Sequence, residues 1–103
     1  MNIRQLAPVI RTKNAGPFII SADIIFDDAQ VYEKVKRSGI IIREYVARLY
    51  RVPLQEILSV HYFDEGRCIK INIKRPVASG DIGDTDVLAM QQHAPLLAID
   101  IPE

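Results

Sequence analysis

The stretch that decides the fold is Cys68-Ile69-Lys70-Ile71-Asn72-Ile73-Lys74-Arg75, in which isoleucines alternate with polar side chains. Successive side chains of a strand point to opposite faces, so the isoleucines share one face and Lys70, Asn72 and Lys74 share the other. The pattern predicts a strand of an antiparallel sheet. We expect its isoleucine row to lie under helices and its polar face to meet water or a polar partner.

Two further strands are predicted before this stretch. Residues Ile57 to Phe63 form one of them, and Asp64-Glu65-Gly66-Arg67 has the composition of a hairpin turn leading into Cys68. Phe18 to Phe26 is rich in Ile and Phe and alternates in the same way. A last strand is predicted over Leu96 to Ile101. The polar face of the sheet is then expected to carry Ser21, Asp23, Ser59, His61, Lys70, Asn72, Lys74 and Asp100.

Two segments with the residue spacing of helices lie between the strands predicted over residues 18–26 and 57–63. Asp27-Asp28 supplies an N-cap and an acidic first turn for a helix that begins near Ala29 and ends at Gly39. A second helical stretch carries apolar residues at i, i+4, i+7 and i+8, which are Ile42, Val46, Leu49 and Tyr50, and it ends before Pro53.

The remaining segments complete the order. Pro8 lacks an N–H group, so residues Leu6 to Ile10 are predicted as an edge strand or an extended lead-in. Residues 11–17 and residues 76–86 are predicted as loops, and residues 86–93 as a short helix. The order from Phe18 onward is the split βαβ order (βαββαβ) of ferredoxin-like folds. We therefore expect an α+β two-layer sandwich, with a broken first helix and a short N-terminal lead-in.

Composition excludes several classes of protein. The 103 residues contain no repeat or long linker, so one domain over residues 1–103 is expected. Thirteen basic residues balance thirteen acidic ones, which disfavours nucleic acid and anionic membranes as partners. Apolar runs are far shorter than a membrane span, and the first residues have no signal-peptide pattern. The single cysteine, Cys68, fits a reducing compartment, so we expect a cytoplasmic protein.

The first candidate site is the predicted loop over residues 11–16. Arg11 and Lys13 provide two cations and Asn14 an amide, around backbone that Gly16 can open. Arginine binds carboxylates and phosphates bidentately, so this loop is a candidate anion-binding segment. The alternative interpretation is ordinary turn chemistry. The chain has no nucleotide-binding or paired-cysteine motif, and neither a cofactor nor a metal is expected.

The second candidate site lies around the predicted helix over residues 86–93. Gly83, Asp84 and Thr85 lead into its N-terminus, where free N–H groups bind anions unless Asp84 or Thr85 caps them. His93 lies at its other end, either as a C-terminal cap or as a site residue. If the two loops converge, Arg11, Lys13 and Arg75 would surround the helix N-terminus, with His93 or Asp84 assisting proton transfer.

Several strings in the chain are specific enough to point to a family. The string Val9-Ile10-Arg11-Thr12-Lys13-Asn14-Ala15-Gly16-Pro17-Phe18 resembles the opening of the family called domain of unknown function 4387. Further matches are Asp23-Ile24-Ile25-Phe26-Asp27-Asp28, and Gly83-Asp84-Thr85-Asp86 followed by Gln91-Gln92-His93-Ala94-Pro95-Leu96-Leu97. The resemblance covers nearly the whole chain. It implies a small ferredoxin-fold protein that accompanies a large subunit similar to the acyclic terpene utilisation protein AtuA.

The resemblance also implies a function. Proteins of that system resemble enzymes of organic-acid or acyl-thioester catabolism, and hydration or dehydration is the reaction expected. The chain would then be the small subunit of a lyase, sharing a small carboxylate substrate with its larger partner and inactive alone. The alternative is a module without chemistry that only mediates protein association, including self-association into a homo-oligomer.

Overall fold

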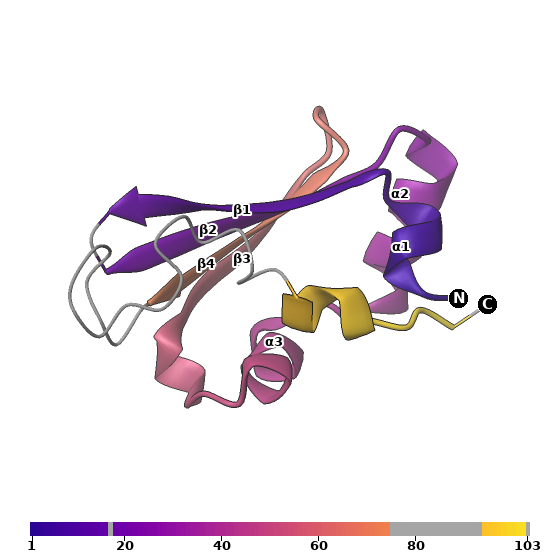
Figure 1. Ribbon diagram of the computed structural model, residues 1–103. Coiled ribbons are helices and arrows are strands. Elements are labelled where there is room, and N and C mark those ends of the chain that lie inside the picture. Colours follow the sequence, from indigo (N-terminus) through magenta and orange to yellow (C-terminus); the bar gives the residue numbers. More distant parts are fainter. Residues whose placement is uncertain (17, 75–93, 103) are drawn as a thin grey trace.

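The computed structural model describes residues 1–16, 18–74 and 94–102. Four antiparallel strands form one sheet in the order β1-β2-β4-β3 (Figure 1). The strands are β1 (Val9–Gly16), β2 (Ile19–Ile25), β3 (Ile57–Phe63) and β4 (Cys68–Lys74). The helices are α1 (Ile3–Leu6), α2 (Ala29–Ser38) and α3 (Arg43–Tyr50), with short 3₁₀ helices η1 (Leu54–Glu56) and η2 (Ala94–Ala98).

The architecture is α+β, as predicted, and is compatible with a ferredoxin-like split βαβ arrangement. The strand β2, the broken helix α2–α3 and the strand β3 follow one another, and β4 then returns between β3 and β2. In Figure 1, α3 and η2 lie beneath the sheet, while α1 and α2 lie at one end of it. All described helices therefore leave the upper face of the sheet free.

The isoleucine row of β4 lies under the helices, which confirms the predicted assignment of the two faces of this strand. Ile71 pairs with Ala22 on one side and Val60 on the other, and its side chain is fully buried. Lys74 is exposed on the opposite face. The hydrophobic core draws residues from both the sheet and the helices. It includes Ile3, Ala22, Ile24, Phe26, Tyr32, Val35, Ile41, Val46, Ile57, Ile69, Ile71, Ile73, Leu96, Ile99 and Ile101.

The helix boundaries follow the expected capping chemistry. The side chain of Asp28 accepts a hydrogen bond from the Gln30 backbone N–H at 2.8 Å, and Gly39 ends α2 in a left-handed conformation with φ of 67°. The helix α3 begins one residue later than its apolar pattern suggests. Ile42, predicted on the buried stripe, is the N-cap residue and is largely exposed.

The segment predicted as a loop over residues 11–16 is instead part of a strand. β1 runs from Val9 to Gly16 and pairs with β2 along its length, with one irregularity between Asn14 and Gly16. An edge strand tolerates lysine and arginine, because its side chains reach water and their charge discourages pairing with other chains. Backbone pairing with β2 therefore outweighs the turn-like composition of this segment.

The predicted last strand is also different. Residues 94–98 form η2, and only an isolated bridge joins Asp100 to Asn2. Asp100 thus lies beside the N-terminus, 3.4 Å from the Met1 ammonium group, and not on the polar face of the sheet. β1 takes the sheet edge beside β2 that a last strand would occupy. The predicted helix over residues 86–93 lies outside the described residues.

A polar cluster ties the turn between β3 and β4 to α2. The Tyr32 hydroxyl donates a 2.6 Å hydrogen bond to Asp64, and the Lys36 ammonium group approaches the same carboxylate at 2.9 and 3.1 Å. These contacts lower the pKa of Asp64, the Tyr32 hydrogen bond most strongly. Burial together with the Asp64 contact raises the pKa of Tyr32. The cluster serves the fold, because it holds the hairpin against the helix.

Candidate functional site

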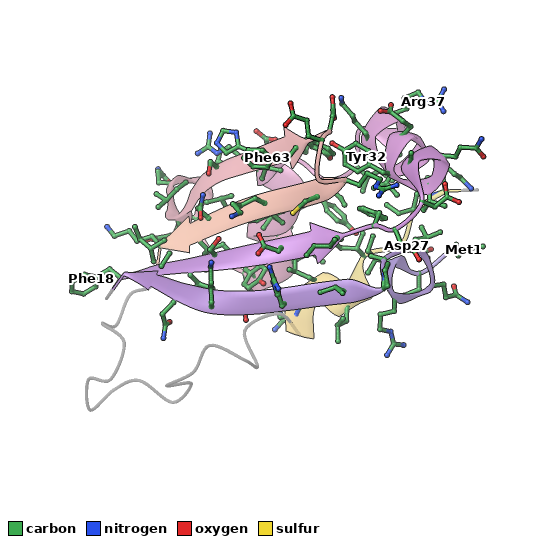
Figure 2. All side chains as sticks on the ribbon, turned by 90° about the horizontal axis from the view of Figure 1, so that it is seen from above. Met1, Phe18, Asp27, Tyr32, Arg37 and Phe63 are labelled. Carbon is green, nitrogen blue, oxygen red and sulfur yellow. The ribbon has the colours of Figure 1, made fainter. Side chains whose placement is uncertain are left out.

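The face of the sheet opposite the helices is the candidate functional surface (Figure 2). Figure 2 looks onto it, and no described helix lies over it. We call it the open sheet face. It consists of Val9, Arg11, Lys13, Ile19, Ser21, Asp23, Ile25, Ser59, His61, Phe63, Cys68, Lys70, Asn72 and Lys74. The strand register arranges most of these side chains in three rows that cross all four strands.

The first row is apolar. Val9, Ile25, Cys68 and Phe63 are successive partners across β1, β2, β4 and β3. Val9 is 39% exposed and Phe63 is 50% exposed, so much of the row is open to solvent. The ring of His61 lies beside that of Phe63, with 6.1 Å between their centroids. This row is a continuous apolar strip at one end of the open sheet face.

The second row is charged and is organised around a buried carboxylate. Asp23 on the central strand β2 lies between Arg11 and Lys70, and His61 completes the row. The Arg11 Nε atom lies 3.4 Å from one oxygen of Asp23, and the Lys70 ammonium group lies 3.7 Å from the other. Only 3% of Asp23 is exposed, and its Oδ1 atom accepts no hydrogen bond from the described residues. Two cations therefore compensate one carboxylate that the strands keep from water.

The third row is polar. Lys13, Ser21, Asn72 and Ser59 are partners across the sheet, and the Asn72 side-chain amide donates a 2.9 Å hydrogen bond to the Ser59 hydroxyl. Lys74 lies beyond this row, opposite Ile19. Among the described residues, the open sheet face thus carries four cations, Arg11, Lys13, Lys70 and Lys74, against the single carboxylate of Asp23. These residues give the face a net positive charge, although the whole chain is neutral.

The surroundings of Cys68 favour its neutral thiol over the thiolate. Burial raises the pKa of its thiol, and the Asp23 carboxylate raises it further, against the smaller opposing effect of Lys70 and Arg11. A catalytic cysteine needs a lowered pKa, because the thiolate is the nucleophile. Cys68 therefore belongs to the apolar row as a packing residue and not as a nucleophile.

The structure describes four of the site residues nominated from the sequence. Arg11 and Lys13 project onto the open sheet face, whereas Asn14 pairs with Ile20 and belongs to the helix-covered face. Gly16 ends β1, and a Cβ atom there would meet nothing within 4 Å, so packing does not require glycine. The other nominated residues lie outside the described part of the chain; they are Arg75, Gly83, Asp84, Thr85 and His93. The predicted anion site and the role of His93 or Asp84 in proton transfer stay predictions.

The apolar row is the feature that sequence reasoning missed. Alternation puts Ile25 on the same face as Asp23 and Phe63 on the same face as His61, although neither was included in the predicted polar face. Each of these residues is unremarkable in its own strand. What identifies the row is that these residues lie next to one another at one end of the sheet. This can be seen only once the pairing register of the strands is known.

Several hollows lie on the described residues, apart from the nominated site residues. Hollows of about 270 Å³ and 340 Å³ flank β3, and a third of about 200 Å³ lies beside α1, but no nominated site residue lines any of them. Within residues 1–16, 18–74 and 94–102, no group of His, Cys, Asp or Glu side chains is arranged to hold a metal ion. None of the helices seen in these residues is long and apolar enough to cross a membrane.

A comparison with protein families gives a match over most of the chain. The model of the family described as "Domain of unknown function (DUF4387)" matches residues 3–100. The chain belongs to this family. The DUF4387 match runs from α1 to the bridge at Asp100 and so includes all four strands of the open sheet face. In the comparisons with curated proteins and with solved structures, nothing matches.

Proposed function

We propose that this chain is the small accessory subunit of a two-component enzyme and that it docks through the open sheet face onto a larger protein similar to AtuA. One observation supports the docking most directly. The apolar row of Val9, Ile25, Cys68 and Phe63 crosses the sheet on the face that no described helix covers. Contiguous exposed apolar surface of this kind marks interaction sites in soluble proteins.

The face combines the two components of a protein interface. Such interfaces have an apolar part with aromatic side chains and a polar part that stays partly solvated. Here the apolar row includes the half-exposed ring of Phe63, and the charged row around Asp23 runs alongside it. The side chains stand on paired strands, so little backbone ordering is required on binding. The large partner itself is suggested by the resemblance of the sequence to proteins that accompany AtuA.

In this proposal the larger protein supplies most of the chemistry. The reaction is the hydration or dehydration of a small carboxylic acid or acyl thioester, and the small chain stabilises the large subunit or completes its site. Arg11 and Lys13 are the described residues best suited to hold a substrate carboxylate, since both are cations on the docking face. His93 and Asp84 remain candidates for proton transfer.

A second candidate function is protein association without chemistry. Two observations favour it. The pKa of the Cys68 thiol is raised, and the Arg11 guanidinium already contacts the Asp23 carboxylate. In this version the chain holds the large subunit together and contributes no group to the reaction. The two versions share the docking surface and differ in what Arg11 and Lys13 do.

One experiment tests the complex and separates the two versions. The chain and the AtuA-like protein of the same organism are co-expressed, and we expect them to co-purify as a complex whose turnover exceeds that of the large protein alone. Arg11→Ala and Lys13→Ala should abolish turnover in the first version, and full turnover from complexes of both variants would establish the second. A monodisperse monomer in sedimentation, together with failure to co-purify, would remove the proposal altogether.

A further inference from the structure

We infer that the surface that receives the open sheet face is acidic, with apolar side chains beside its carboxylates. This inference rests on the proposed function and specifies the chemistry of the partner. Its first support is charge. Among the described residues, Arg11, Lys13, Lys70 and Lys74 stand on this face against the one carboxylate of Asp23, whereas the chain as a whole has no net charge. Like-charged surfaces repel at close range, and complementary ones accelerate association.

The second support is the geometry around Asp23. Its carboxylate contacts Arg11 and Lys70 from the two neighbouring strands, so it fixes both cations above the centre of the sheet. The two cations are not buried by this contact, because 64% of the Arg11 side chain and 36% of the Lys70 side chain remain exposed. Arg11 approaches Asp23 through Nε at 3.4 Å, a long contact that leaves the guanidinium able to bind a second carboxylate. Carboxylates from a partner can therefore join a charge cluster that is already positioned.

The same observations disfavour two other occupants. A second copy of this chain would bring two positively charged faces together, with one carboxylate on each side to offset the cations. Nucleic acid would suit the charge, but sheets that bind single strands stack bases on aromatic side chains of their central strands. On the open sheet face, the central strands β2 and β4 carry no aromatic residue, and the rings of His61 and Phe63 both lie on the edge strand β3.

The test measures how charge affects formation of the complex with the AtuA-like protein. Raising NaCl from about 50 mM to about 500 mM should increase Kd by about tenfold or more, because salt screens the attraction between the cations and the partner's carboxylates. Lys13→Glu and Lys74→Glu should each slow association by about tenfold. Both residues are outside the Asp23 contacts, so these variants are expected to fold. Lys34→Glu is the matched control, since it makes the same charge change at an exposed position on α2 and should leave the association rate unchanged.

The outcomes separate this inference from the proposed function. A complex with a salt-independent Kd and normal association of Lys13→Glu and Lys74→Glu would overturn the acidic partner surface while leaving docking itself in place. Absence of any complex would overturn both. A dimer of the chain alone that dissociates in these variants would overturn the inference in favour of self-association. Binding of a single-stranded RNA oligonucleotide that Lys13→Glu abolishes would overturn it in favour of nucleic acid.

Discussion

Ile71→Ala is expected to lower the free energy of unfolding by about 2–5 kcal/mol. Ile71 is fully buried at the centre of β4 and has neighbours on both sides, Ala22 on β2 and Val60 on β3. Truncation removes the transfer free energy of the lost carbons and leaves a cavity that paired strands cannot close. Urea denaturation of the isolated chain, followed by circular dichroism, measures the change.

The control for this substitution is Lys74→Ala on the same strand. Lys74 is exposed on the open sheet face, so its truncation should change the free energy of unfolding by less than about 0.5 kcal/mol. Ile71→Val, at about 0.5–1.5 kcal/mol, provides a measurable value if the alanine variant does not fold. Equal effects of Ile71→Ala and Lys74→Ala would contradict the register of β4 and the separation of the two faces.

Phe63→Ala is expected to weaken the proposed complex with an AtuA-like protein by about 2 kcal/mol, roughly thirtyfold in Kd. Interface energy concentrates in a few large side chains that become fully desolvated on binding. Phe63 is the largest side chain of the apolar row and is 50% exposed in the free chain, so its remaining surface is available to a partner. Isothermal titration calorimetry of the purified variant against the large protein measures the loss.

Phe18 offers a matched control, because it is the same residue type with the same exposure of 50%. It precedes β2 and lies at the far end of the sheet from the apolar row (Figure 2). Phe18→Ala should therefore leave Kd close to that of the unmodified chain. Equal losses in the two variants would show that the apolar row contributes nothing specific to the docking surface.

The sequence predicted the fold where one face of an element is buried. In β4, period-two alternation coincides with the covered and open faces of the sheet, so every side chain from Ile69 to Lys74 lies on the expected face. Local chemistry also sufficed at the ends of α2, where Asp28 caps the first turn and Gly39 adopts a positive φ. In these places the local signals and the tertiary packing agree.

The terminal segments could not be predicted in the same way. Arg11, Lys13, Asn14 and Gly16 favour turns by composition, yet they form an edge strand because β2 offers a free row of backbone partners. Residues 96–101 have the apolar content of a strand but pair with the N-terminal segment. The Ile3 N–H donates to the Ile99 carbonyl and the Ile101 N–H donates to the Met1 carbonyl, both at 2.9 Å. Pairing between residues so far apart in the chain cannot be recognised from the local sequence of either segment.

The candidate site was predictable in its members but not in its organisation. Alternation placed Asp23, His61 and Lys70 on one polar face, which the structure confirms. It did not reveal that Asp23 is buried between Arg11 and Lys70, because that depends on the register of β1, and the edge strand or lead-in predicted from the sequence ended at Ile10. The apolar row was hidden for the same reason, since its members come from four separate strands.

The most direct test of the proposed docking through the open sheet face uses Cys68, the only cysteine of the chain and a member of the apolar row. Its thiol is partly exposed in the free chain, so iodoacetamide should alkylate it slowly at mildly alkaline pH. Mass spectrometry of the small chain follows the reaction with and without saturating AtuA-like protein. The account predicts that alkylation slows by about tenfold or more in the complex, because the partner excludes the reagent. An unchanged rate in a complex that remains assembled would contradict it.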